Sequence, residues 1–78
     1  TEPPADVFEE PDHVLVLVEL PGVGPEDVTL ELSGGTLTVA AARGRKRYRK
    51  DVALPLAPAA DRLTHACRNG VLEVRIAR

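Results

Sequence analysis

The stretch VTLELSGGTLTVAAA, residues 28–42, contains the pattern that decides the fold. Residues 28–32 alternate between apolar and polar side chains, which predicts a strand with one buried and one wet face. Residues 33–35 (SGG) then supply glycines, which tolerate the positive φ angles of tight hairpin turns. Residues 36–42 begin a second alternating run. The stretch is therefore predicted to form an antiparallel β-hairpin.

The rest of the chain has the same character. Seven prolines and six glycines interrupt short runs rich in Val, Leu and Thr, and no segment has a helical period. The run at 13–20 is apolar at almost every position, so we expect both of its faces to be covered. Residues 56–62 are expected to be a loop. Strands are predicted near residues 6–9, 13–20, 28–32, 36–42, 45–54, 63–68 and 71–76. The 78 residues are thus predicted to be one all-β, immunoglobulin-like sandwich of two antiparallel sheets with about seven short strands.

Charge is segregated along the chain. Nine acidic residues lie between Glu2 and Glu31 without a Lys or Arg among them, whereas six basic residues gather at 43–50. This arrangement predicts charge pairing between segments of the chain or between subunits. A nucleic-acid partner is not predicted, because the pI is about 5.6 and Phe8 and Tyr48 are the only aromatic residues.

Composition also indicates the cellular environment in which the protein is expected. Cys67 is the only cysteine, so an internal disulfide is excluded, which fits a reducing cytoplasm. No stretch approaches the roughly 20 apolar residues of a membrane span, so no membrane partner is expected. The chain begins at Thr1 and contains no Met, so we expect it to be a piece of a longer protein.

Four segments together carry a family resemblance. They are ELPGVGPEDVTLEL (19–32), LSGGTLTV (32–39), YRKDVALP (48–55) and NGVLEVRI (69–76). In this order they resemble the α-crystallin domain of small heat-shock proteins, the Hsp20 family, over about residues 6–76. The resemblance implies an ATP-independent holdase that self-associates and binds unfolded or partly unfolded client proteins, with no enzymatic activity and no cofactor. It also implies that residues 1–78 are a single domain without its N-terminal arm and C-terminal tail.

Two strands are candidates for the edges of the sandwich, namely residues 28–32 and 63–68, because a small sandwich leaves its sheets open. In the family, the corresponding strands flank a hydrophobic groove that receives an Ile-x-Ile peptide from another subunit. The resemblance therefore implies a groove lined by Val28, Leu30, Leu32, Leu63, His65 and Cys67. The alternative is that these six are ordinary core positions.

The chain departs from the family in places. His65 stands where an Ala is usual. Only residues 41–46 join the two predicted strands on either side of them, whereas many members have a longer segment there that is exchanged between subunits. A strand-swapped dimer is therefore doubtful. Residues 45–52 could instead pair with their own copy, and the basic strand of Arg45, Arg47, Tyr48, Arg49 and Lys50 is a candidate subunit interface or simply a solvated hairpin. The alternative function is an Hsp20-like interaction domain appended to or docked on a larger protein, such as an anion-pump-type ATPase.

No catalytic constellation is visible. Ser33 lies in a Gly-rich turn without a neighbouring base. His65 and Cys67 share one face of a predicted strand and could be half of a metal site, with His13 as a third ligand. The favoured interpretation is a half-buried histidine and a core cysteine, so no metal is predicted.

Overall fold

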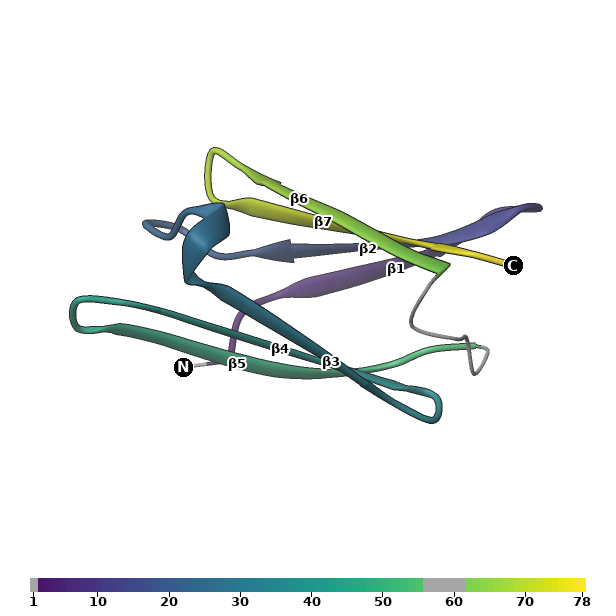
Figure 1. Cartoon of the computed structure of the whole chain (residues 1–78), viewed down its shortest axis with the longest axis horizontal. Coiled ribbons are helices and arrows are strands. Elements are labelled where there is room, and N and C mark those ends of the chain that lie inside the picture. The colour runs from purple at the N-terminus through teal and green to yellow at the C-terminus, as the bar shows by residue number, and fades with distance from the viewer. Residues whose placement is uncertain (1, 56–61) are drawn as a thin grey trace.

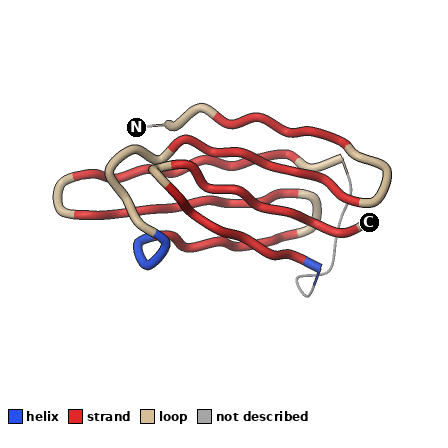
Figure 2. The backbone as a smooth tube through the Cα atoms, turned by 90° about the horizontal axis from the view of Figure 1, so that it is seen from above, coloured by secondary structure: helices blue, strands red, loops and turns tan. Residues whose placement is uncertain are grey.

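The computed structural model describes residues 2–55 and 62–78 and consists of seven strands and one short 3-10 turn. The elements are β1 (Ala5–Glu9), β2 (His13–Glu19), η1 (Pro25–Asp27), β3 (Val28–Ser33), β4 (Thr36–Arg43), β5 (Lys46–Ala53), β6 (Leu63–Arg68) and β7 (Val71–Ala77). Two antiparallel sheets, in the orders β1-β2-β7-β6 and β3-β4-β5, lie face to face (Figure 1). The strands of both sheets run along the molecule (Figure 2). This confirms the predicted all-β sandwich; the loop predicted at 56–62 lies outside the described residues except for Arg62.

The core is the layer between the two sheets. In β2 and β7 every second residue is buried, and the register places these residues side by side, as in the pairs Val16↔Val74 and Val18↔Leu72. Leu37 and Val39 of β4 supply the opposite wall and are fully buried. Branched aliphatic side chains suit such a pleated surface, because they pack well against their cross-strand neighbours. The core is therefore built almost entirely from Val and Leu.

The prediction that both faces of residues 13–20 are covered is wrong. Val14, Val16 and Val18 are fully buried, but Leu15 and Leu17 on the opposite face are only half-buried. The reason is architectural: β2 is an inner strand of its sheet, yet among the described residues no third layer covers the outer face of that sheet. An apolar run in a sequence does not by itself distinguish a strand between two layers from a strand with a half-open face.

Two tight hairpin turns join β6 to β7 and β4 to β5. Asn69 and Gly70 both have positive φ, 52° and 75°, which is the arrangement of a type I′ turn and sets the register of β6 on β7. Residues 44 and 45 form a two-residue turn between β4 and β5. The link between β4 and β5 therefore contains no additional strand that a partner could receive.

No helix in the described ranges is long and apolar enough to cross a membrane.

Candidate peptide-binding groove

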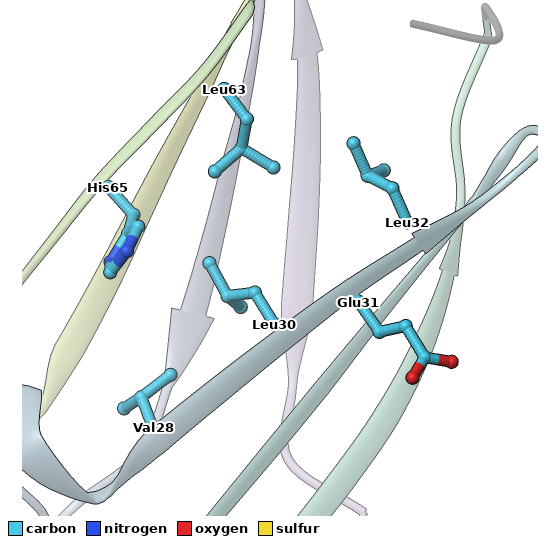
Figure 3. Close-up of a pocket in the computed structure, with 6 residues that line it drawn as sticks. All are labelled: Val28, Leu30, Glu31, Leu32, Leu63 and His65. Carbon is cyan, nitrogen blue, oxygen red and sulfur yellow. The ribbon is translucent and has the colours of Figure 1, made fainter. Parts of the chain in front are cut away.

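A groove opens where the free edges of the two sheets meet. β3 is an edge of the three-stranded sheet and β6 is an edge of the four-stranded sheet. Between them lies a pocket of about 270 Å³ (Figure 3). Its lining combines four aliphatic side chains with one carboxylate and one imidazole, namely Val28, Leu30, Leu32, Leu63, Glu31 and His65.

Strand register explains why the aliphatic residues face the groove. Leu30 pairs with buried Val39, and Leu63 pairs with buried Ile76, so both point to the inner side of their sheets. Because β3 and β6 are edges, their inward side chains are covered by neighbours on one flank only. Val28, Leu30, Leu32 and Leu63 are consequently half-buried while they still pack against the core. The groove is thus an unfilled margin of the core, which reconciles the two alternatives left open by the sequence.

The structure brings five of the six groove candidates together and places the sixth elsewhere. Cys67 lies in the core, 9% exposed, with its Sγ 4.0 Å from the carbonyl oxygen of Val23. Burial raises the pKa of the Cys67 thiol, and the nearby Asp27 and Glu26 carboxylates raise it further. The thiol is therefore a packed, protonated core group behind the groove.

Glu31 is the lining residue that sequence reasoning missed. Alternation assigned it to the wet face of β3, and its carboxylate indeed points away from the aliphatic lining in Figure 3. It reaches the pocket because β3 is an edge strand whose rim is open. No sequence signal distinguishes such a rim residue from any other exposed residue of the strand.

His65 is the polar member of the inner lining. Its register partner is buried Val74, so the ring lies on the inner side of β6, yet the residue is exposed because it lies at the edge. In Figure 3 the imidazole lies on the Val28 side of the pocket, while Leu63 points towards Leu30. The groove therefore has an aliphatic part and a part bordered by an imidazole.

The two remaining residues of the proposed metal set do not join His65. Cys67 is behind the groove, and His13 lies in a different network: its Nδ1 donates to Asp12 at 2.6 Å, while its Nε2 accepts from Arg75 at 2.8 Å. The hydrogen bond from His13 is the main cause that lowers the pKa of Asp12. Across residues 2–55 and 62–78, no three His, Cys, Asp or Glu side chains are grouped to hold a metal ion.

The basic strand is β5, at the other edge of the three-stranded sheet. The basic run at 43–50 is partly neutralised within the chain. Lys50 of β5 contacts Glu2 at 2.9 Å, and Arg43 at the end of β4 contacts Glu26 and Asp27 at 2.8 and 3.1 Å. The Tyr48 hydroxyl donates to the carbonyl oxygen of Pro21 at 2.8 Å and ties β5 to the turn after β2. The basic run thus pairs in part with the acidic N-terminal half of the same chain.

Comparison with known proteins places these features in a family. The family model described as "Hsp20/alpha crystallin family" matches residues 6–78. Heat shock protein 16.0 from Schizosaccharomyces pombe is 28% identical, with a TM-score of 0.85 over 100% of this chain and 67% of that one. HspA from Xanthomonas axonopodis is 29% identical, with a TM-score of 0.84 over 100% and 94%.

A mutant of hsp14.1 from Sulfolobus solfatataricus P2 is 27% identical, with a TM-score of 0.85 over 97% of this chain and 77% of that one. A comparison with curated protein sequences found no match. The family match covers nearly the whole chain, and the solved structures share both the two-sheet architecture and more than a quarter of the residues. The chain therefore belongs to the Hsp20/α-crystallin family and is a small heat-shock protein domain.

Proposed function

We propose that this domain is the core of an ATP-independent chaperone that self-associates and binds aggregation-prone, unfolded proteins. The observation that carries the proposal is the apolar groove between the free edges of β3 and β6, found in a chain of the Hsp20 family. Such a chaperone needs exposed apolar surface and open strand edges, and it needs no catalytic site. We therefore propose no enzymatic activity and no cofactor.

The occupant we propose for the groove is an extended Ile-x-Ile segment from the tail of another subunit. In a strand, residues i and i+2 point to the same side about 6.6 Å apart, so both Ile side chains can enter the groove. One would lie among Leu30, Leu32 and Leu63, and the other near Val28 and His65. Full burial of each aliphatic side chain would contribute about 1.5–3 kcal/mol before ordering costs.

A matched pair of substitutions on β3 tests the groove. Leu30→Asp places a charge inside it, whereas Thr29→Asp places the same charge on the opposite, exposed face of the same strand. We expect Leu30→Asp to weaken binding of a fluorescent Ile-x-Ile peptide by more than tenfold and Thr29→Asp to change it by less than twofold. Equal affinity in both variants would contradict the groove assignment.

A second variant tests the groove even if Leu30→Asp unfolds the domain. His65 is exposed, so His65→Trp leaves the core untouched and fills the groove from its rim. We expect this variant to retain its β circular dichroism and its melting temperature while it loses peptide binding. If His65→Trp binds the peptide as well as the parent domain, the peptide does not occupy the space between β3 and β6.

Chaperone activity requires its own assay. The full-length protein should suppress light scattering of a heat-denatured client at a stoichiometric ratio without ATP, and Leu30→Asp should reduce this protection. Retained peptide binding without any suppression would instead support the interaction domain of a larger protein. We also propose a cytoplasmic location, with which the single, buried and unpaired Cys67 thiol is compatible.

A further inference from the structure

Phe8 is an aromatic side chain that the fold leaves in solvent, and it is 46% exposed. Its register partner on β2 is Leu15, whose neighbours Val14 and Val16 are buried. Since successive side chains of a strand point to opposite faces, Phe8 lies on the outer face of the four-stranded sheet. The ring is therefore displayed on the side of that sheet that faces away from the core.

Carboxylates surround the Phe8 ring. Asp6 lies two residues before it on the same face of β1, and Glu10 is exposed just beyond the end of the strand. Neither of these two carboxylates forms an ion pair within residues 2–55 and 62–78, whereas Glu9 contacts Arg78 at 2.9 Å. The outer side of β1 thus presents one ring with negative charge beside it.

A hollow lies on the opposite outer face of the molecule. Ala40 and Ala42 alternate with two buried residues of β4, so their methyl groups point outward from the three-stranded sheet. These small side chains leave a hollow of about 200 Å³, here called the alanine hollow, between Thr29 on one flank and Arg47 on the other. A cavity of about 150 Å³ holds a benzene ring, so the alanine hollow has room for one phenyl ring.

Two arginines stand beside the alanine hollow. Arg47 donates to carbonyl oxygens of its own hairpin at 3.0 and 3.4 Å and forms no ion pair in the part of the chain that the structure describes. Arg49, two residues along on the same face, is 73% exposed and lies 3.8 Å from Asp51. The carboxylate in the lining, Asp27, is already bound to Arg43 at 3.1 Å. The β5 flank of the hollow is therefore positively charged.

The ring and the alanine hollow complement each other in size and in charge. We propose that Phe8 of one copy of this chain inserts into the alanine hollow of a second copy. The ring would lie on the two methyl groups beside Arg47, because a guanidinium is attracted to an aromatic face. Asp6 and Phe8 have the same two-residue spacing as Arg49 and Arg47, about 6.6 Å, so the carboxylate would reach the second arginine. Both halves of the contact are present in this chain, so a second copy supplies it without any other partner.

The position of the two halves determines the kind of assembly. Phe8 is on the outer face of one sheet and the alanine hollow is on the outer face of the other (Figure 1), so two copies cannot exchange both contacts at once. The contact is therefore heterologous, and it builds a ring or a filament instead of stopping at a dimer. It uses neither the groove between β3 and β6 nor the backbone edge of β5, so it stands apart from the peptide site proposed above.

Two complementary variants test the contact. Phe8→Ala removes the ring, and Ala42→Glu fills the hollow and places a carboxylate beside Arg47. We expect each variant alone to self-associate about tenfold more weakly than the parent chain in sedimentation equilibrium. Val71→Ala truncates another exposed apolar side chain on the outer face of the same sheet as Phe8, and it should change nothing. Leu30→Asp should also leave this association unchanged.

Mixing the two variants gives the sharper measurement, since each has the half that the other lacks. The methyl signals of Ala40 and Ala42 in isotope-labelled Phe8→Ala chain should shift when unlabelled Ala42→Glu chain is added. Adding unlabelled Phe8→Ala chain should not shift them. Because each variant has only one intact half, the mixture should form a 1:1 pair and nothing larger through this contact.

Three results would overturn the proposal. Equal shifts with both additions, or none with either, would show that Phe8 does not occupy the hollow. A parent chain that stops at dimers and keeps them in Phe8→Ala would assign self-association to another surface, such as β5. Methyl signals that shift with N-acetyl-phenylalanine amide but with no copy of the chain would show that the hollow takes a ring from a different protein.

Discussion

Gly70 should be the turn glycine that this domain tolerates losing least. It has φ of +75°, and a Cβ added there would lie 3.1 Å from Cα of Pro21 and 3.3 Å from the carbonyl oxygen of Leu20. Its own carbonyl accepts the Leu20 amide at 2.6 Å, so the turn between β6 and β7 is fastened to the end of β2. A side chain at this position would have to displace backbone atoms, which have little freedom to move.

Gly44 is the matched control. It has φ of +60°, but nothing lies within 4 Å of an added Cβ. Gly44→Ala therefore incurs the left-handed strain of about 1–2 kcal/mol, less about 0.4–1 kcal/mol gained by restricting the unfolded chain. A net loss of about 0.5–1 kcal/mol follows. Gly70→Ala adds the crowding, which costs about 1–3 kcal/mol in packed sites, so its loss should be about 1.5–4 kcal/mol.

Urea denaturation followed by far-ultraviolet circular dichroism measures both losses. In a domain of this size 1 kcal/mol corresponds to about 4–8 °C in melting temperature, so thermal scans should separate the two variants clearly. Because β6 borders the groove, Gly70→Ala should also weaken Ile-x-Ile binding near its melting range, whereas Gly44→Ala should not. Equal losses of stability would refute the reasoning, since they would show that the contact with Leu20 and Pro21 does not matter.

Three other substitutions give separate outcomes. Tyr48→Phe removes the hydroxyl donor to Pro21 and should lower the free energy of unfolding by about 0.5–1.5 kcal/mol without affecting groove binding; an unchanged urea midpoint would contradict this. The folded-state pKa of Asp12 is lowered, so its contribution to stability is present above about pH 4 and is lost as the pH falls further. Asp12→Asn should therefore make the free energy of unfolding less dependent on pH in this acid range. An unchanged pH dependence would show that the contact between Asp12 and His13 is not the cause of the loss. His65→Ala should deepen the groove enough to bury one more methylene of the peptide. This should strengthen Ile-x-Ile binding by about 0.8 kcal/mol, which is about fourfold in affinity. Weaker binding would instead show that the imidazole itself contacts the peptide.

Much of the fold could be predicted because period-two patterning is local. The hairpin at 28–42 and the turn at Asn69 and Gly70 are specified by neighbouring residues, and the structure has strands at all seven predicted sites. The edge position of β3 and β6 also followed from the small size of the sandwich. Leu30 and Leu63 could be assigned to a groove because the resemblance supplied which two edges face each other.

What could not be predicted depends on how the sheets stack. Cys67 and His65 lie on the same face of β6, yet Cys67 is buried beside the carbonyl oxygen of Val23 and His65 is exposed at the rim. The partners of the basic run were equally out of reach. Glu26 lies 17 residues from Arg43 and Glu2 lies 48 residues from Lys50, and only the folded topology brings these charges together.

The four free edges of the two sheets are protected in different ways, and the difference indicates what each can bind. β1 is short and is preceded by Pro3 and Pro4, which offer no amide to a partner strand. β5 displays alternating cations, which discourage unselective pairing at its edge. β3 and β6 have neither prolines nor a row of cations on their inner side, and they face each other across an aliphatic groove. Since β3 and β5 are separated only by β4, about 10 Å apart, one sheet can present an apolar and a charged edge to two different strands at the same time.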